Sequence, residues 1–307
     1  MHGGHGHSHD HAHNHGHAPA DYGWAFALGI ILNAGFVAIQ FGYGYLANSL
    51  ALISDAVHNL SDVLSLVLAW AAIWFGRKGP TAKRTYGYRR ASILAALANA
   101  ALLLVAVGAI VFEAVERLGH PQPVASTTVL WVAAAGIVVN GATALFFLRG
   151  REHDINIEGA FLHMAADAAV SLGVVIAALL IRWTGYDWID PLASLVVAAV
   201  IVLSSWGLTR NAFNLAMDAV PSHIDSGEVR KSLIALDGVK GVHDLHIWAM
   251  STTEVALTAH LVAPGTNSDQ LIAAACHELE THFSIRHVTL QIESGEQACP
   301  LAPAHTV

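Results

Sequence analysis

The sequence predicts an α-helical membrane protein in which six transmembrane helices are followed by a C-terminal α+β domain. The first observation is composition: 54% of the 307 residues are hydrophobic and 12% are charged, which is unusual for a soluble domain. The second is length, because six apolar segments can each cross the ~30 Å of hydrocarbon that roughly 20 helical residues span. The third is a change beyond about residue 225, where short polar and apolar runs alternate.

The six apolar segments also predict the direction of the membrane helices. They run approximately over residues 22–46, 51–75, 91–117, 126–148, 157–182 and 190–212. The basic residues of the connections gather in two of them, residues 76–90 and the stretch with Arg149 and Arg151. Positively charged loops remain on the cytoplasmic side of a membrane. We therefore expect both termini in the cytoplasm and, for a bacterial source, insertion in the inner membrane.

The chain is expected to divide into four regions. Residues 1–20 contain eight histidines among small and polar residues, which predicts a disordered tail that collects metal ions. Residues 21–214 form the six-helix membrane domain. Residues 215–296 form a cytoplasmic domain for metal binding and dimerisation, with the element order αββαβ. Residues 297–307 form a flexible tail.

A His-x-x-x-Asp pair occurs twice in the apolar segments, as His58 and Asp62 in the second and as His163 and Asp167 in the fifth. Residues four apart share one helix face. A carboxylate in the membrane costs on the order of 2.5–3.5 kcal/mol, so these groups need partners. Because the two spans run in opposite directions, each histidine can approach the other span's aspartate. Two nitrogens and two oxygens then form a tetrahedral set that suits Zn²⁺ and also accepts Cd²⁺ or Co²⁺.

Asp55 lies on the same helix stripe as this pair. Two interpretations stay open for it. It could form hydrogen bonds between helices, or it could support the metal ligands from outside the coordination shell.

The C-terminal domain contains a second candidate metal site. His243 and His260 lie on two adjacent predicted strands, and Glu293 ends the third, so the three side chains could meet near a dimer interface. His246 and His287 are weaker candidates, and Cys299 in the tail could join them. The sequence leaves the number of ions in this domain open.

Five motifs resemble the cation diffusion facilitators, in particular the zinc, cadmium and cobalt branch of bacterial-type zinc transporters. They are "SLALISDAVHNLSDVLSL" at 49–66, "RTYGYRRASILAALANA" at 84–100, "EGAFLHMAADAAVSLGVV" at 158–175, "WIDPLASL" at 188–195 and "VHDLHIWAMSTTEVALTAHLV" at 242–262. The resemblance implies a homodimer with six membrane helices and a ferredoxin-like, metallochaperone-like cytoplasmic domain. It also implies exchange of a cytoplasmic divalent cation for protons.

The resemblance assigns roles to particular residues. It implies a transport site at His58, Asp62, His163 and Asp167, and a histidine in the first of these positions is usual in zinc and cadmium transporters. It matches His243, His260 and Glu293 to cytoplasmic metal-binding positions, where Zn²⁺ would act as a regulatory ligand in addition to being the substrate. The expected partners are a second copy of the chain, the lipid bilayer, divalent metal ions and protons, with no nucleic acid.

The histidines offer a way to couple metal release to protons. A histidine cannot hold a proton and bind a metal ion through the same nitrogen, so protons entering from outside could release the ion, as an antiporter requires.

Other function classes are less compatible with the sequence. The stretch "HELETH" at 277–282 is not a metallopeptidase motif, because its histidines are five residues apart and diverge around the helix. We therefore expect no enzyme. A metal-gated channel or a metal sensor without coupled transport remains the alternative.

Overall fold

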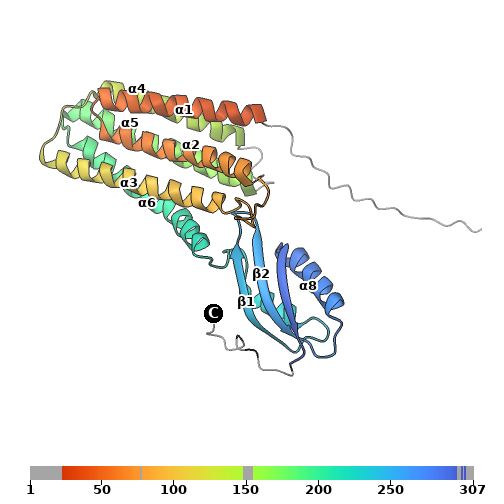
Figure 1. The fold of residues 1–307 in the computed structure, drawn as a ribbon. Coiled ribbons are helices and arrows are strands. Elements are labelled where there is room, and N and C mark those ends of the chain that lie inside the picture. Colours follow the sequence, from red (N-terminus) through yellow and green to blue (C-terminus); the bar gives the residue numbers. More distant parts are fainter. Residues whose placement is uncertain (1–22, 77, 148–154, 296–298, 300, 302–307) are drawn as a thin grey trace, which may run out of the picture.

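The computed structural model describes residues 23–76, 78–147, 155–295, 299 and 301. The predicted N-terminal histidine tract lies outside these described residues. Six long helices form a bundle, and a smaller α+β domain extends from one end of it (Figure 1). The long helices are α1 (Gly23–Leu46), α2 (Leu50–Gly76), α3 (Ala91–Gly119), α4 (Ser126–Phe147), α5 (Ile155–Thr184) and α6 (Ile189–Ala216). The predicted fold class is confirmed.

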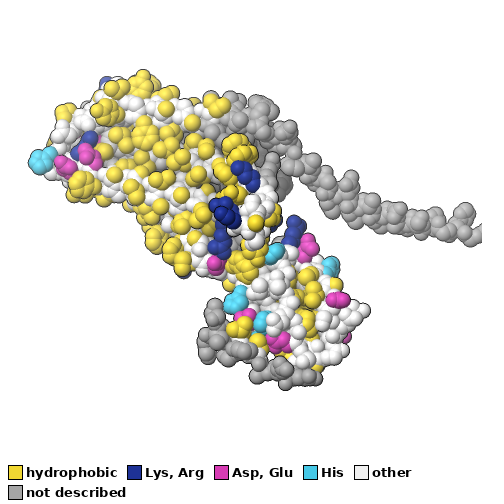
Figure 2. Space-filling view, viewed as in Figure 1, with side chains coloured by type: hydrophobic (Ala, Val, Ile, Leu, Met, Phe, Trp, Pro, Cys, Tyr) yellow, Lys and Arg dark blue, Asp and Glu magenta, His cyan; other side chains and the backbone are white. Residues whose placement is uncertain are grey.

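The bundle has an apolar exterior, and its interior combines apolar side chains with buried polar groups such as Asp55, Asp167 and Asp190. Helix α3 packs on α6 and α4 packs on α5, while α2 contacts α1, α3, α5 and α6. Large apolar side chains such as Phe112, Trp131 and Leu203 are exposed on its surface, where hydrophobic residues form a broad band (Figure 2). Three helical stretches, Ala91–Gly119, Met164–Thr184 and Ile189–Ala216, are long and apolar enough among the described residues to cross a membrane. An apolar exterior is what a lipid-facing helix requires.

The turn between α1 and α2 is hydrogen-bonded to the start of α6. The Leu50 backbone N–H donates to Asp190 Oδ2 at 2.6 Å, and the Ser49 hydroxyl donates to Asp190 Oδ1. Asp190 is buried, so its carboxylate satisfies the first backbone donors of α2 where water is scarce. Ser54 and Ser194, one turn further along, share a hydrogen bond of 2.8 Å between their hydroxyls. Helices α2 and α6 are therefore joined at this end of the bundle.

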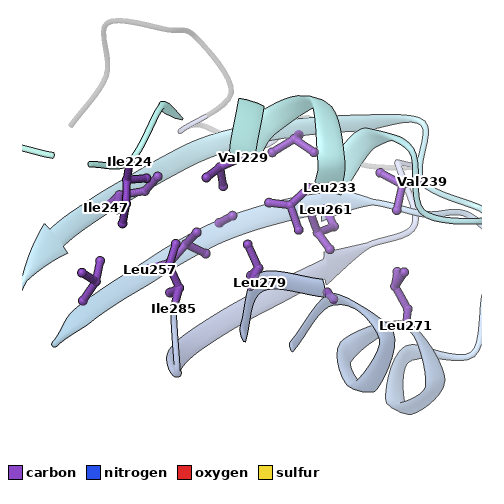
Figure 3. Close-up of a cluster of buried hydrophobic side chains, with 14 of the residues drawn as sticks. Ile224, Val229, Leu233, Val239, Ile247, Leu257, Leu261, Leu271, Leu279 and Ile285 are labelled. Carbon is purple, nitrogen blue, oxygen red and sulfur yellow. The ribbon is translucent and has the colours of Figure 1, made fainter. Parts of the chain in front are cut away.

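The C-terminal domain contains α7 (Ser226–Ile234), β1 (Gly241–Ala249), β2 (Val255–Val262), α8 (Ser268–Phe283) and β3 (His287–Glu293). The sheet has the order β1-β2-β3, in which β1 is antiparallel and β3 parallel to β2. Asp225 and Asn267 cap the two helices by accepting backbone N–H groups. Apolar side chains of α7 and α8 meet Leu257 and Leu261 of β2 in one core (Figure 3).

Polar contacts join the two domains. Arg89, just before α3, donates to Glu254 in the β1–β2 turn at 2.6 Å, and the Thr252 N–H donates to the Ser92 hydroxyl at 3.1 Å. Arg90 pairs with Asp218 just after α6. Lys and Arg side chains gather at this junction in Figure 2. The basic connection at residues 76–90 therefore lies against the C-terminal domain.

Candidate metal centres

Three ligating side chains meet inside the helical bundle. His58 and Asp62 lie one turn apart on α2, and Asp167 comes from α5. One ligand atom from each lies within 4.8 Å of the others. His58 Nε2 and Asp167 Oδ1 are 2.9 Å apart. His163 belongs to α5 four residues before Asp167, but its side chain is outside the described residues. The bundle thus brings together three of the four predicted transport ligands and places the fourth on the same helix.

Asp55 is buried one turn from this cluster and links three helices. Its Oδ2 accepts hydrogen bonds from Gln40 Nε2 of α1 at 2.8 Å and from Ser171 Oγ of α5 at 3.0 Å. Gln40 Oε1 in turn accepts a hydrogen bond from Asn59 of α2 at 2.8 Å. Asp55 is not among the clustered ligand atoms, and its contacts tie the ligand-bearing helices α2 and α5 to each other.

A cavity of about 250 Å³ reaches the intramembrane cluster and is lined by His58, Asp62 and Asp167. A second cavity, of about 590 Å³, lies beside the domain junction and is lined by Arg89 and Glu254. The two cavities share three lining residues, Ser65, Asn99 and Leu208. Asn99 of α3 is buried and donates to the Ser65 hydroxyl at 2.8 Å. Ser65 and Asn99 therefore line both the cavity at the domain junction and the cavity at the intramembrane ligands.

The second cluster lies on the face of the sheet opposite α7 and α8. Side chains alternate along a strand, so His260 points away from its buried neighbours Ala259 and Leu261. His243 is paired directly with His260 across the β1–β2 ladder, and Glu293 lies at the end of β3. Strand pairing thus explains why residues distant in sequence converge on one face.

Four ligating groups surround one point in this second cluster. Ligand atoms of His243, His260, Glu293 and Cys299 lie within 4.8 Å of one another. Glu293 Oε1 is 3.1 Å from His260 Nδ1, and Glu293 Oε2 is 3.4 Å from His243 Nε2. Cys299 Sγ is 3.6 Å from His260 Nδ1. Two nitrogens, one carboxylate and one thiol are a ligand set that fits Zn²⁺.

The charge state of Glu293 suits a cation site. Burial raises the pKa of this carboxyl group, but the Cys299 thiol, the Gln291 amide, His243 and His260 together outweigh burial. The pKa of Glu293 therefore lies below its ordinary value, and the group is an anion at neutral pH. An anion between two histidines favours a bound cation or proton there.

Two known protein domains match this chain. The cation efflux transmembrane domain matches residues 26–215, and the cytoplasmic domain of cation efflux proteins matches residues 221–295. The chain belongs to the cation efflux family. The helical bundle and the C-terminal domain of this cation diffusion facilitator each correspond to one of the two matches.

Relatives of this family member are named as metal transporters. A cadmium, cobalt and zinc/H⁺-K⁺ antiporter of Bacillus subtilis is 37% identical over 273 residues, covering 87% of this chain and 88% of the relative. The zinc transporter ZitB of Escherichia coli is 35% identical over 271 residues, covering 87% and 86%. A solved structure of the metal-bound C-terminal domain of the CzcD transporter is 39% identical to this chain. The match covers 23% of this chain and 99% of the solved domain, with a TM-score of 0.21.

Two predicted cytoplasmic candidates lie outside the four-residue cluster of this facilitator. His246 Nε2 is 2.9 Å from Asp244 Oδ1, and His287 stacks edge-on against Tyr86 of the basic connection at 5.3 Å between ring centroids. Cys299 does lie in the cluster.

The sequence interpretation did not single out Asn99 or Asp244. A lone amide in an otherwise apolar span, and a carboxylate between two candidate histidines, are the signals that could have found them.

Proposed function

We propose that this chain is a secondary active transporter that exports Zn²⁺, and also Cd²⁺ or Co²⁺, from the cytoplasm in exchange for protons. Family membership and the names of its relatives support metal transport. The intramembrane cluster supplies nitrogen and carboxylate ligands to a divalent cation without a sulfur ligand among its described members, His58, Asp62 and Asp167. Transport of a metal ion requires no catalytic group.

The observation that carries proton exchange is the contact between His58 Nε2 and Asp167 Oδ1, 2.9 Å apart. A carboxylate only accepts hydrogen bonds, so one proton must lie between these two atoms, on the imidazole or on the carboxyl group. A metal ion that binds through the same atoms must displace that proton. Metal and proton therefore compete for His58 and Asp167, which is the coupling that an antiporter needs.

Two adjoining cavities support the direction of export. One is lined by the intramembrane ligands and the other by Arg89 and Glu254, beside the basic connection at residues 76–90, and Ser65 and Asn99 line both. Positively charged connections favour the cytoplasmic side. On this basis we propose that both termini lie in the cytoplasm and that, in a bacterium, the chain lies in the inner membrane. The opposite end of the bundle is fastened by Ser49 and Asp190. This arrangement supports loading from the cytoplasm, after which α2 and α5 must separate on the outer side.

The cytoplasmic domain is proposed to form a homodimer and to hold a regulatory Zn²⁺ ion at His243, His260, Glu293 and Cys299. The matched family domain supports the dimer, and the convergence of the ligands supports the metal ion. Asp55 is proposed to support the transport ligands through Ser171 and the α5 backbone that carries Asp167.

The test is Zn²⁺ flux into proteoliposomes with an imposed proton gradient. Wild type is compared with Asp62→Ala and Asp167→Ala, and Ala169→Ser on the exposed face of α5 is the matched control. We expect saturable flux that disappears when the gradient is dissipated, is lost in both aspartate variants and is kept in the control. Flux that does not saturate would favour the channel, and metal binding without flux would favour the sensor.

A further inference from the structure

The carboxylate of Asp244 lies between His260 of the cytoplasmic cluster and His246. Its Oδ2 is 3.4 Å from His260 Nε2, and its Oδ1 is 2.9 Å from His246 Nε2. The other ring nitrogen of His260, Nδ1, faces Glu293 Oε1 at 3.1 Å. The two nitrogens of His260 therefore face two different carboxylates, only one of which belongs to the four-residue cluster.

The backbone at Asp244 departs from a regular strand to make this contact. The ladder pairs His243 with His260 but His246 with Thr258, so β1 has one more residue than β2 between the two pairs. Such a bulge re-aims side chains, and here it puts His243 and His246 on the same face of the sheet. Asp244 itself has φ 49°, in the left-handed region that a non-glycine residue adopts at a cost.

Two ring nitrogens of the cluster, His243 Nε2 and His260 Nδ1, lie beside the carboxylate of Glu293. His243 Nε2 is buried and has no hydrogen-bond partner among the described residues. If His260 Nε2 carries its proton toward Asp244, then Nδ1 presents a lone pair to the anionic Glu293. Two acceptors 3.1 Å apart repel each other unless a metal cation or a second proton lies between them.

We propose that Asp244 is a positioning residue of the cytoplasmic metal centre. Its carboxylate accepts the Nε2 proton of His260, which fixes the tautomer and ring orientation so that Nδ1 binds a divalent cation together with Glu293 and Cys299. A carboxylate behind a metal-binding histidine raises the basicity of the ligand and commonly affects affinity 10- to 100-fold. This inference rests on the proposed regulatory metal site, and it does not require proton-coupled transport.

The experiment is a Co²⁺ titration of the purified full chain carrying Cys276→Ser, which leaves Cys299 as the only thiol. A near-ultraviolet charge-transfer band from thiolate to Co²⁺ then reports this centre alone, because neither residues 1–20 nor the intramembrane cluster contains a cysteine. We expect Asp244→Asn to weaken Co²⁺ binding about 10- to 100-fold and to change the visible d–d bands at saturation. Asparagine tolerates the left-handed backbone, so the bulge is retained.

His246→Gln is the matched control, because His246 contacts the other oxygen of the same carboxylate. It should keep Co²⁺ affinity within about threefold, well below the change expected for a lost supporting carboxylate. Asp244→Gly is a second variant in case the first one folds poorly, because glycine also accepts a positive φ. It should lose as much Co²⁺ affinity as Asp244→Asn.

Three outcomes would overturn the proposal. Unchanged affinity and unchanged d–d bands in the Asp244 variants would remove its positioning role. An equal loss in His246→Gln would assign the effect to the shape of the bulge. A missing charge-transfer band in the parent chain would refute the thiol-containing centre itself. Proton-coupled flux, measured separately, would be unaffected by that last result, so the two proposals fail independently.

Discussion

The two clusters of candidate metal ligands in this protein differ in chemistry and in support. In both, one atom from each ligand lies within 4.8 Å of the others. The described intramembrane ligands are His58, Asp62 and Asp167, whereas the cytoplasmic set includes the thiol of Cys299. Thiolate, imidazole and carboxylate ligands all lose a metal ion on protonation, and a soft thiolate adds affinity for Zn²⁺. A site without sulfur suits a cargo that must leave, and a site with sulfur suits a bound regulator.

The support of the ligands differs in the same direction. The cytoplasmic histidines are fixed in adjacent strands whose backbone hydrogen bonds continue on both sides. The intramembrane ligands lie on α2 and α5, and α5 packs mainly against α4. Polar contacts such as His58 with Asp167 and Asp55 with Ser171 join α2 to α5. Two helices joined by a few hydrogen bonds can separate during transport, whereas neighbouring strands of a sheet cannot.

The largest expected effect is the loss of a carboxylate from the cargo site. Asp167→Asn keeps the shape of the side chain but removes its charge, so a bound cation would lose an anionic ligand in the membrane interior. We expect proton-coupled Zn²⁺ flux to fall by at least ~100-fold, in line with the several kcal/mol that an uncompensated buried charge costs. The Co²⁺–thiolate band of the cytoplasmic centre should be unchanged. If both signals fell together, the clusters would not be separate sites.

The next effect should come from Asp55. Asp55→Asn removes the charge while its amide can still hydrogen-bond Ser171 and Gln40, which now contact Asp55 Oδ2. We expect a Zn²⁺ affinity of the cargo site about tenfold weaker, because groups that orient metal ligands commonly have effects of this size. Equilibrium binding in a Cys299→Ser background would measure it. Gln40→Glu serves as the comparison: it keeps a polar contact but adds charge, and unchanged binding in both variants would leave Asp55 a purely structural link.

Local periodicity made much of the fold and of the cargo site predictable. The six apolar segments match α1 to α6 closely, because a membrane helix must satisfy its own backbone hydrogen bonds. Asp62 and Asp167 stood out because each lies four residues from a histidine in an apolar segment. His243 and His260 could be paired because strand alternation puts both on one face.

Contacts between distant segments could not be predicted in this way. Helical spacing does not specify the neighbours of Asp55, since Gln40 and Ser171 come from two other helices. Asp244 reaches His260 through one extra residue in β1, and nothing in the hydrophobic pattern indicates that bulge. The register of paired strands depends on tertiary packing, which one-dimensional alternation does not contain.

A smaller effect is expected from the thiol that distinguishes the two clusters. Cys299→Ser replaces the sulfur ligand by a weaker hydroxyl donor while leaving His243, His260 and Glu293 in place. We expect the Zn²⁺ concentration for half-maximal activation of transport to rise about 3- to 10-fold, with the maximal rate unchanged, since the affected site is the proposed regulatory one. Cys276→Ser in α8 is the matched control. A lower maximal rate with unchanged activation would instead place Cys299 in the transport cycle.

The smallest effect concerns the contact through which the two regions can communicate. Arg89 and Glu254 are paired at 2.6 Å with side chains 43% and 46% exposed, so the pair contributes less than about 1 kcal/mol to stability. We expect Glu254→Gln to leave thermal stability and the Zn²⁺ affinity of the cargo site unchanged. It should reduce activation by cytoplasmic metal about twofold, because the coupling free energy between the two sites that passes through this contact cannot exceed the energy of the contact. Glu228→Gln, which breaks the exposed pair with Lys231 far from the junction, is the control. Equal activation in both variants would show that the clusters communicate by another route, such as the Thr252 to Ser92 hydrogen bond.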